Sequence, residues 1–161
     1  MMCMERSRWK TYALWLLVTE AVGALSGFLT RNGAKLYAAT VTKPPLSPPS
    51  MVFPIVWGIL FALMAIGAAR VDLSSPSGER SSALRLYWVQ LGVNFLWSIL
   101  FFNLRAWFFS LVWLILLWVL VLRLVRAFGR VDTWAGRLQI PYLLWVSFAA
   151  YLTAGVWLLN R

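Results

Sequence analysis

The side chains best suited to hold a ligand lie on one face of a predicted helix. Gln90, Asn94, Trp97, Ser98 and Phe101 are spaced i, i+4, i+7, i+8 and i+11, so they share one side of a helix with about 3.6 residues per turn. Carboxamides exchange hydrogen bonds and aromatic rings stack, which together could orient a flat ligand with a few polar atoms. The same side chains could instead join neighbouring helices through hydrogen bonds. The residue types alone leave both interpretations open.

Two further segments carry aromatic side chains at helical spacing. An indole N–H or a phenol O–H usually needs a hydrogen-bond partner when it is buried, so each face is expected to point towards other protein groups or a ligand. Packing between helices is the alternative explanation for both faces. The members are Trp57, Phe61 and Met64 in one segment, and Tyr142, Trp145, Ala149 and Leu152 in the other.

The composition removes most catalytic chemistry. The chain has no His, a single Cys (Cys3) and five acidic residues. A zinc site of His and Cys, a Ser–His catalytic pair and a His-ligated haem iron are therefore excluded. We expect no metal, no resident cofactor and no catalytic residue, and on these residues alone we do not predict an enzyme.

The elements that position these faces are predicted membrane spans. Hydrophobic residues make up 61% of the 161-residue chain and charged residues only 12%, which is too apolar for a water-soluble domain of this size. Crossing the hydrocarbon core takes about 20 apolar residues, and five segments approach or reach that length with Glu20 as their only charged residue. We predict an all-α fold, a single integral membrane bundle of five transmembrane helices over residues 1–161. The predicted spans are Tyr12–Leu29, Val52–Ala69, Leu86–Leu104, Ala106–Leu122 and Leu138–Asn160.

The net charge of +10 is distributed unevenly between the two ends of the predicted bundle. Ten basic residues flank the spans on the side of the N-terminus and five on the opposite side. The positive-inside rule then predicts a cytoplasmic N-terminus. Because the basic residues lie at span ends and in short connections, we expect them to face the lipid bilayer and not nucleic acid.

The longest predicted connection, residues 30–51, contains the run Lys43-Pro44-Pro45-Leu46-Ser47-Pro48-Pro49. Proline has a fixed φ and no N–H, so this run is predicted to be extended or turned and not helical. Long connections in compact proteins are often lids or binding loops. We expect Lys43, Pro44, Pro48 and Pro49 to belong to a lid over one end of the bundle.

Three motifs follow one another along the chain, over about residues 37–157. The first consists of Lys43-Pro44, Pro48-Pro49 and Phe53-Pro54-x-x-Trp57. The second is Gln90-Leu91-x-x-Asn94-x-x-Trp97 with Phe101-Phe102, and the third is Pro141-Tyr142-x-x-Trp145-x-x-Phe148-Ala149. In order and spacing they resemble the first connection with the second helix, the third helix and the fifth helix of the translocator protein / tryptophan-rich sensory protein family.

This resemblance implies a five-helix bundle, usually a homodimer, whose cavity opens towards the first connection. Members of the family bind porphyrins and other tetrapyrroles, and some bind cholesterol or synthetic ligands. The resemblance therefore implies a membrane receptor for tetrapyrroles or other apolar ligands, with a part in tetrapyrrole sensing, transport or light-dependent degradation. The lack of His favours a metal-free porphyrin. The implied ligand-binding residues are Trp57, Phe61, Gln90, Asn94, Trp97, Tyr142, Trp145 and Ala149.

Three positions depart from the family pattern. Leu46 stands where many members carry an aromatic residue before the second proline pair, and Tyr37 stands at a position that is often Trp. Ala154 occupies the Tyr position of the sterol-recognition segment of animal members. The last departure argues against cholesterol and for a bacterial-type protein in a bacterial cell membrane.

Some features leave the function open. Glu20 lies mid-span in the first helix, either as a functional carboxylate or as a neutral group hydrogen-bonded within the bundle. Gly23 and Gly27 allow close helix approach, either within the chain or in a dimer. One alternative function is a transporter that moves amphipathic small molecules by alternating access, with Glu20 coupled to protons. Another is a structural or regulatory membrane partner whose aromatic faces pack tightly with no cavity.

Overall fold

The structure, a computed structural model, describes residues 2–161, and their side chains from residue 8 onward. Within this range nearly all of the chain is helical and no strand occurs. The elements in order are α1 (Met2–Leu29), α2 (Arg31–Thr40), α3 (Val52–Asp72), α4 (Gly78–Ser98), the π-helical turn η1 (Ile99–Asn103), α5 (Trp107–Val131), α6 (Thr133–Leu138) and α7 (Ile140–Asn160).

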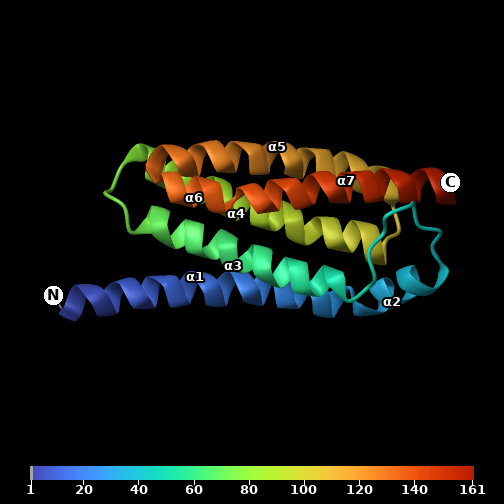
Figure 1. The fold of residues 1–161 in the computed structure, drawn as a ribbon, viewed down its shortest axis with the longest axis horizontal. Helices are drawn as coiled ribbons and strands as arrows, with labels where there is room; N and C mark the ends of the chain where they lie inside the picture. Colours follow the sequence, from blue (N-terminus) through green and yellow to red (C-terminus); the bar gives the residue numbers. More distant parts are fainter. Residues whose placement is uncertain (1) are drawn as a thin grey trace.

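The structure confirms the predicted all-α bundle with five helices that can cross a membrane. Long helices lie side by side along one axis, with α1 at one edge of the bundle (Figure 1). Large apolar side chains such as Leu14, Ile59 and Leu144 remain exposed on its outside, as expected where lipid and not water surrounds a protein. The chain is an integral membrane protein. Its spans are Arg8–Leu29, Val52–Asp72, Gly78–Asn103, Trp107–Val131 and Thr133–Asn160.

At the end that holds the N-terminus, the helices extend beyond the predicted spans. α4 begins at Gly78 and not near Leu86, because the Ser77 hydroxyl caps the helix by accepting a hydrogen bond from the backbone N–H of Arg80 (3.1 Å). α5 continues past Arg123 to Val131. Apolar runs therefore mark the lipid-crossing part of each helix and not its full length.

The connection between the first two spans is more ordered than the sequence suggested. α2 occupies Arg31–Thr40 and packs beside η1. Gly33 makes this contact possible, because a Cβ at that position would lie 2.5 Å from the backbone oxygen of Phe102. After α2 the backbone is extended at Val41 and irregular through the Lys43–Pro49 run, as predicted.

An ion pair closes the end of the bundle away from α2. The Arg70 guanidinium on α3 contacts both carboxylate oxygens of Asp132, at 3.1 and 3.2 Å. Asp132 also caps α6 by accepting a hydrogen bond from the backbone N–H of Ala135 (3.0 Å). Burial acts to raise the pKa of Asp132, but the Ala135 hydrogen bond and the Arg70 guanidinium outweigh it and hold the pKa below its ordinary value of 3.8.

Candidate ligand-binding site

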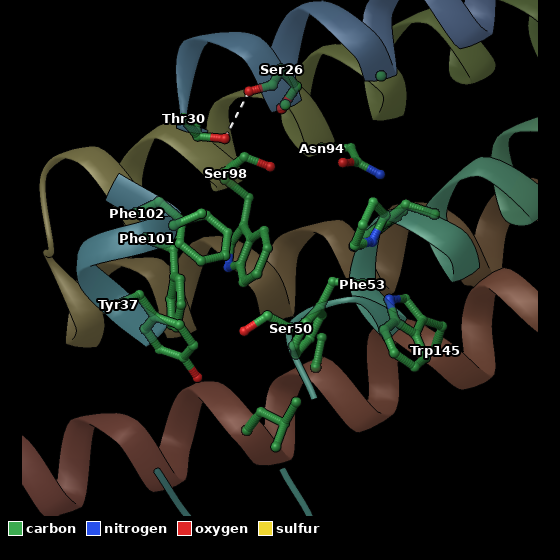
Figure 2. A pocket seen from close by; sticks show the side chains of 18 of the residues that line it. Ser26, Thr30, Tyr37, Ser50, Phe53, Asn94, Ser98, Phe101, Phe102 and Trp145 are labelled. Carbon is green, nitrogen blue, oxygen red and sulfur yellow. Dashed lines mark hydrogen bonds between the residues drawn. The ribbon is translucent and has the colours of Figure 1, made fainter. Parts of the chain in front are cut away.

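A cavity of about 510 Å³ lies between α1, α3, α4, η1 and α7, beneath α2 and the loop that follows it. This volume is within the range of about 300–1,000 Å³ typical of small-molecule sites. Most of its lining is aromatic or aliphatic. Figure 2 shows aromatic side chains around it from α2, α3, η1 and α7, namely Tyr37, Phe53, Phe101, Phe102 and Trp145.

Six of the eight predicted ligand-binding residues line this cavity: Trp57, Phe61, Asn94, Trp97, Trp145 and Ala149. The structure places the other two, Gln90 and Tyr142, elsewhere. Both are fully buried behind Asn94 and are not among the lining residues. The helical spacing that predicted them identifies the side of a helix, but it does not tell how far the hollow extends along that side.

Gln90 and Tyr142 instead hold Asn94 in position through a chain of hydrogen bonds. The Asn94 Nδ2 donates to the Tyr142 hydroxyl (2.7 Å), and that hydroxyl donates to Gln90 Oε1 (2.7 Å). A phenol has one proton, so a Tyr142 hydroxyl that donates to Gln90 must accept from Asn94. Asn94 Oδ1 has no hydrogen-bond partner among the described residues, which leaves an acceptor on the cavity wall.

The cavity also has an unused hydrogen-bond donor. Trp97 is 7% exposed, and its Nε1 is buried with no partner among the described residues. Its ring stacks on Phe101, with the ring centres 5.1 Å apart. An unpaired buried N–H is unfavourable by roughly 1–3 kcal/mol, so a ligand acceptor that reached it would bind more tightly.

The aromatic faces of α3 and α7 meet at Trp57. Its ring centre lies 5.5 Å from that of Phe61, 6.2 Å from that of Tyr142 and 6.4 Å from that of Trp145. The contacts of Trp57 with Tyr142 and Trp145 are edge-on, which is a favourable geometry for aromatic pairs. Residues from two separate spans thus form one continuous aromatic wall.

The predicted lid residues play different parts. Lys43 and Pro48 line the cavity, Pro44 is buried against α7 at Gly155, and Pro49 is exposed. The Lys43 ammonium donates to the backbone oxygens of Ala38 and Val41 (both 3.1 Å) and lies over the Tyr37 ring. It thereby satisfies carbonyls at the C-terminal end of α2.

Two side chains of α7 that the sequence did not single out fasten this loop. Asn160 Oδ1 accepts the Thr42 N–H (3.1 Å), and Asn160 Nδ2 donates to the Thr42 oxygen (2.8 Å). The Tyr151 hydroxyl donates to the Pro45 oxygen (2.7 Å). The sequence gives little sign of these contacts, because the partners are more than a hundred residues apart and the loop contributes only backbone atoms.

Comparison with known proteins places this architecture in a family. The model of the TspO/MBR family matches residues 15–158. The chain is 37% identical to the tryptophan-rich protein TspO of Chlorobaculum tepidum, over 93% of this chain and 96% of that one. It is 34% identical to the protein CrtK of Rhodobacter capsulatus, over 92% of each chain. It is 32% identical to the human translocator protein, over 90% of this chain and 88% of that one.

The chain belongs to the TspO/MBR family. The predicted resemblance is therefore confirmed.

This TspO/MBR protein also lines its cavity with side chains that the motifs did not include. Ser26 of α1, Thr30 at the N-cap of α2 and Ser98 of α4 add hydroxyl groups. Figure 2 shows the hydrogen bond from Thr30 Oγ1 to the Ser26 backbone oxygen (2.8 Å). Glu20 lines the cavity too, with no hydrogen bond or ion pair to any described residue. Ser98 and Glu20 already stand out in the sequence. A small polar residue in an otherwise apolar segment is the signal that could have identified Ser26.

Proposed function

We propose that this protein is a membrane receptor for a tetrapyrrole or a comparable flat, largely apolar ligand. The observation that carries the proposal is the convergence of Trp57, Trp97, Trp145 and Asn94, from three different spans, on one cavity. Membership of the TspO/MBR family supports the same function. The bound ligand would then be available for sensing, transport or degradation, and the bacterial relatives favour a bacterial cell membrane.

The geometry suggests how such a ligand is held. The Trp57, Phe61 and Trp145 rings provide an apolar wall for the macrocycle, and burial of that apolar surface supplies most of the affinity. Asn94 Oδ1 can accept a hydrogen bond from the ligand, and Trp97 Nε1 can donate one. The sequence has no His to ligate haem iron, so a metal-free tetrapyrrole is the better match.

Titration of the detergent-solubilised protein with protoporphyrin IX tests this proposal. We expect saturable quenching of tryptophan fluorescence, and roughly tenfold weaker binding in Asn94→Ala, since a buried hydrogen bond to a ligand contributes on the order of 1–2 kcal/mol. Trp134→Phe is the matched control, because Trp134 is 59% exposed and lies outside the cavity. Quenching that does not saturate, or equal affinities for the wild-type protein and Asn94→Ala, would contradict the proposal.

A further inference from the structure

Glu20 marks the inner end of the cavity. It lies on α1 near the middle of the first span. The cavity runs along α1 from Glu20 and reaches Thr30 just past the end of that helix, which is about 15 Å at 1.5 Å per residue. The hydrogen bond between Thr19 and Tyr87 (2.6 Å) sets α1 and α4 at the same level, and both helices run in the same direction in Figure 1. Asn94 follows Tyr87 by seven residues, so it lies about 10 Å nearer the lid than Glu20.

The Glu20 carboxylate has no protein cation to pair with. Among the described residues it makes no hydrogen bond and no ion pair, so no contact in this structure corresponds to a carboxyl group hydrogen-bonded within the bundle. Lys43 is the basic side chain among the lining residues, but it lies at the lid and donates to the Ala38 and Val41 oxygens. On the neighbouring helix α4, the Tyr87 hydroxyl is already bonded to Thr19, the residue before Glu20.

An unpaired carboxylate inside a membrane span is unfavourable unless something else compensates it. Its neighbours in the wall are small: Gly23, Ala24 and Gly27 follow it along α1, and a Cβ at Gly27 would meet nothing within 4 Å. The Phe61 ring lies against Gly23, where a Cβ would come within 2.5 Å of it. Glu20 therefore lines a largely apolar hollow and makes no hydrogen bond or ion pair with any described residue.

We propose that Glu20 forms a cation subsite, at which the cavity binds the protonated amine of an amphipathic ligand while its aromatic body packs against Trp57 and Phe61. This inference rests on the proposed function, because it requires that the cavity bind flat ligands. It adds a charge preference that Asn94 and the aromatic wall do not provide. An ammonium at Glu20 would form a charge-assisted hydrogen bond in a region of low dielectric constant.

Two probes that differ only in charge test the cation subsite. Pyrenylmethylammonium and pyrenemethanol have the same four-ring body, and both accept energy from excited tryptophan, so binding to the solubilised protein is read from pyrene emission. For each protein we compare the affinity for the ammonium with the affinity for the alcohol. We expect this ratio to be about tenfold or more higher in the wild-type protein than in Glu20→Gln. Glu20→Gln should still bind the alcohol saturably, which also shows that the variant is folded. Glu79→Gln removes the same charge from an exposed position outside the cavity and should keep the preference.

Protoporphyrin IX titrations of the same proteins separate this inference from the proposed function. If the alcohol and protoporphyrin IX bind but the preference for the ammonium is equal in wild type and Glu20→Gln, the cation subsite is wrong and the receptor function stands. If the preference is also lost in Glu79→Gln, it reflects overall charge, and the subsite is again wrong. If none of the probes binds wild-type protein saturably, the receptor function itself fails.

Discussion

At the scale of single residues, Tyr142 decides what Asn94 presents to a ligand. Its hydroxyl lies between two carboxamides, accepts a hydrogen bond from Asn94 and donates one to Gln90. This fixes Asn94 with its Nδ2 turned towards Tyr142. Gln90 Nε2, at the far end of the chain, is buried without a partner. The network therefore already contains one unsatisfied group, and it is sensitive to the loss of another.

Tyr142→Phe should destabilise the protein and weaken ligand binding together. It leaves Gln90 Oε1 and Asn94 Nδ2 unpaired in a buried place, which is expected to lower the free energy of unfolding by about 1–3 kcal/mol. Thermal unfolding in detergent measures this. Tyr151→Phe is the comparison, because that hydroxyl is bonded near the surface and its loss should have a much smaller effect. Equal decreases of the unfolding temperature in the two variants would show that the buried hydrogen bonds of Tyr142 contribute no more to stability than the bond of Tyr151 near the surface.

Much of the site could be predicted at this scale, but not its depth. The Asn94–Trp97–Phe101 spacing identified an inward face, and all three residues line the cavity. Gln90 lies on the same face, yet Tyr142 of α7 fills the space in front of it. Where a hollow ends depends on side chains of other helices, which periodicity within one helix does not contain.

At the scale of elements, the lid loop depends on α7. Pro44 lies against Gly155, and the Asn160 side chain bonds both the N–H and the oxygen of Thr42. α7 also supplies Trp145 and Ala149 to the cavity wall. The same helix thus forms part of the site and holds the loop that covers it.

Gly155→Ala should loosen the lid. The new Cβ would lie 2.5 Å from Pro44 Cβ, which is closer than non-bonded carbons approach, so the loop must move away. We expect faster hydrogen exchange at the Thr42 amide and a faster release of bound protoporphyrin IX. Gly92→Ala, where a Cβ would meet nothing within 4 Å, should leave both rates unchanged. Unchanged exchange in Gly155→Ala would mean that this contact does not hold the loop.

The ion pair between Arg70 of α3 and Asp132 at the start of α6 should make the free energy of unfolding depend on pH. The folded pKa of Asp132 lies below 3.8, so its contribution is complete above that value and is lost as the pH falls through the folded pKa. Asp132→Asn can still cap α6 but loses the Arg70 pair, and should reduce stability at neutral pH by up to about 1 kcal/mol. Thermal melts from pH 7 to pH 3 should show the difference from wild type shrinking at the acid end. A difference that grew there would contradict this assignment.

Two elements escaped prediction for physical reasons. α2 is short, contains Gly33 and lacks a side-chain cap, so its local sequence is a weak helix signal. It is held in place by packing against η1. In the π-helical turn, Phe101 stacks on Trp97, and both Phe101 and Phe102 contact Tyr37 of α2, a contact between distant segments that local sequence does not contain.

At the scale of the whole molecule, the cavity and the positive charge lie at opposite ends. The cavity is beneath α2 and the lid, whereas α1 begins at the far end, the end where the α3–α4 connection also lies (Figure 1). Ten of the fifteen basic residues belong to that far end. A cytoplasmic N-terminus, as the positive-inside rule predicts, would make the lid face the outside of the cell.

Labelling of single cysteines in whole cells tests this orientation. In a Cys3→Ser background, Leu46→Cys places a thiol on the lid, where Leu46 is 82% exposed, and Ser75→Cys places one in the α3–α4 connection. A membrane-impermeant maleimide should label the lid position and should reach the Ser75 position only after the cells are opened. The reverse pattern would show that the protein is inserted the other way.

Fluorine NMR of protein labelled with 5-fluorotryptophan tests the central claim most directly, because each indole reports its own surroundings. Single Trp→Phe variants assign the resonances. On addition of protoporphyrin IX, we predict that the signals of Trp57, Trp97 and Trp145 shift and saturate together, while those of Trp9 and Trp134 stay in place. Shifts confined to the exposed tryptophans, or cavity signals that do not move, would contradict a shared ligand site formed by separate spans.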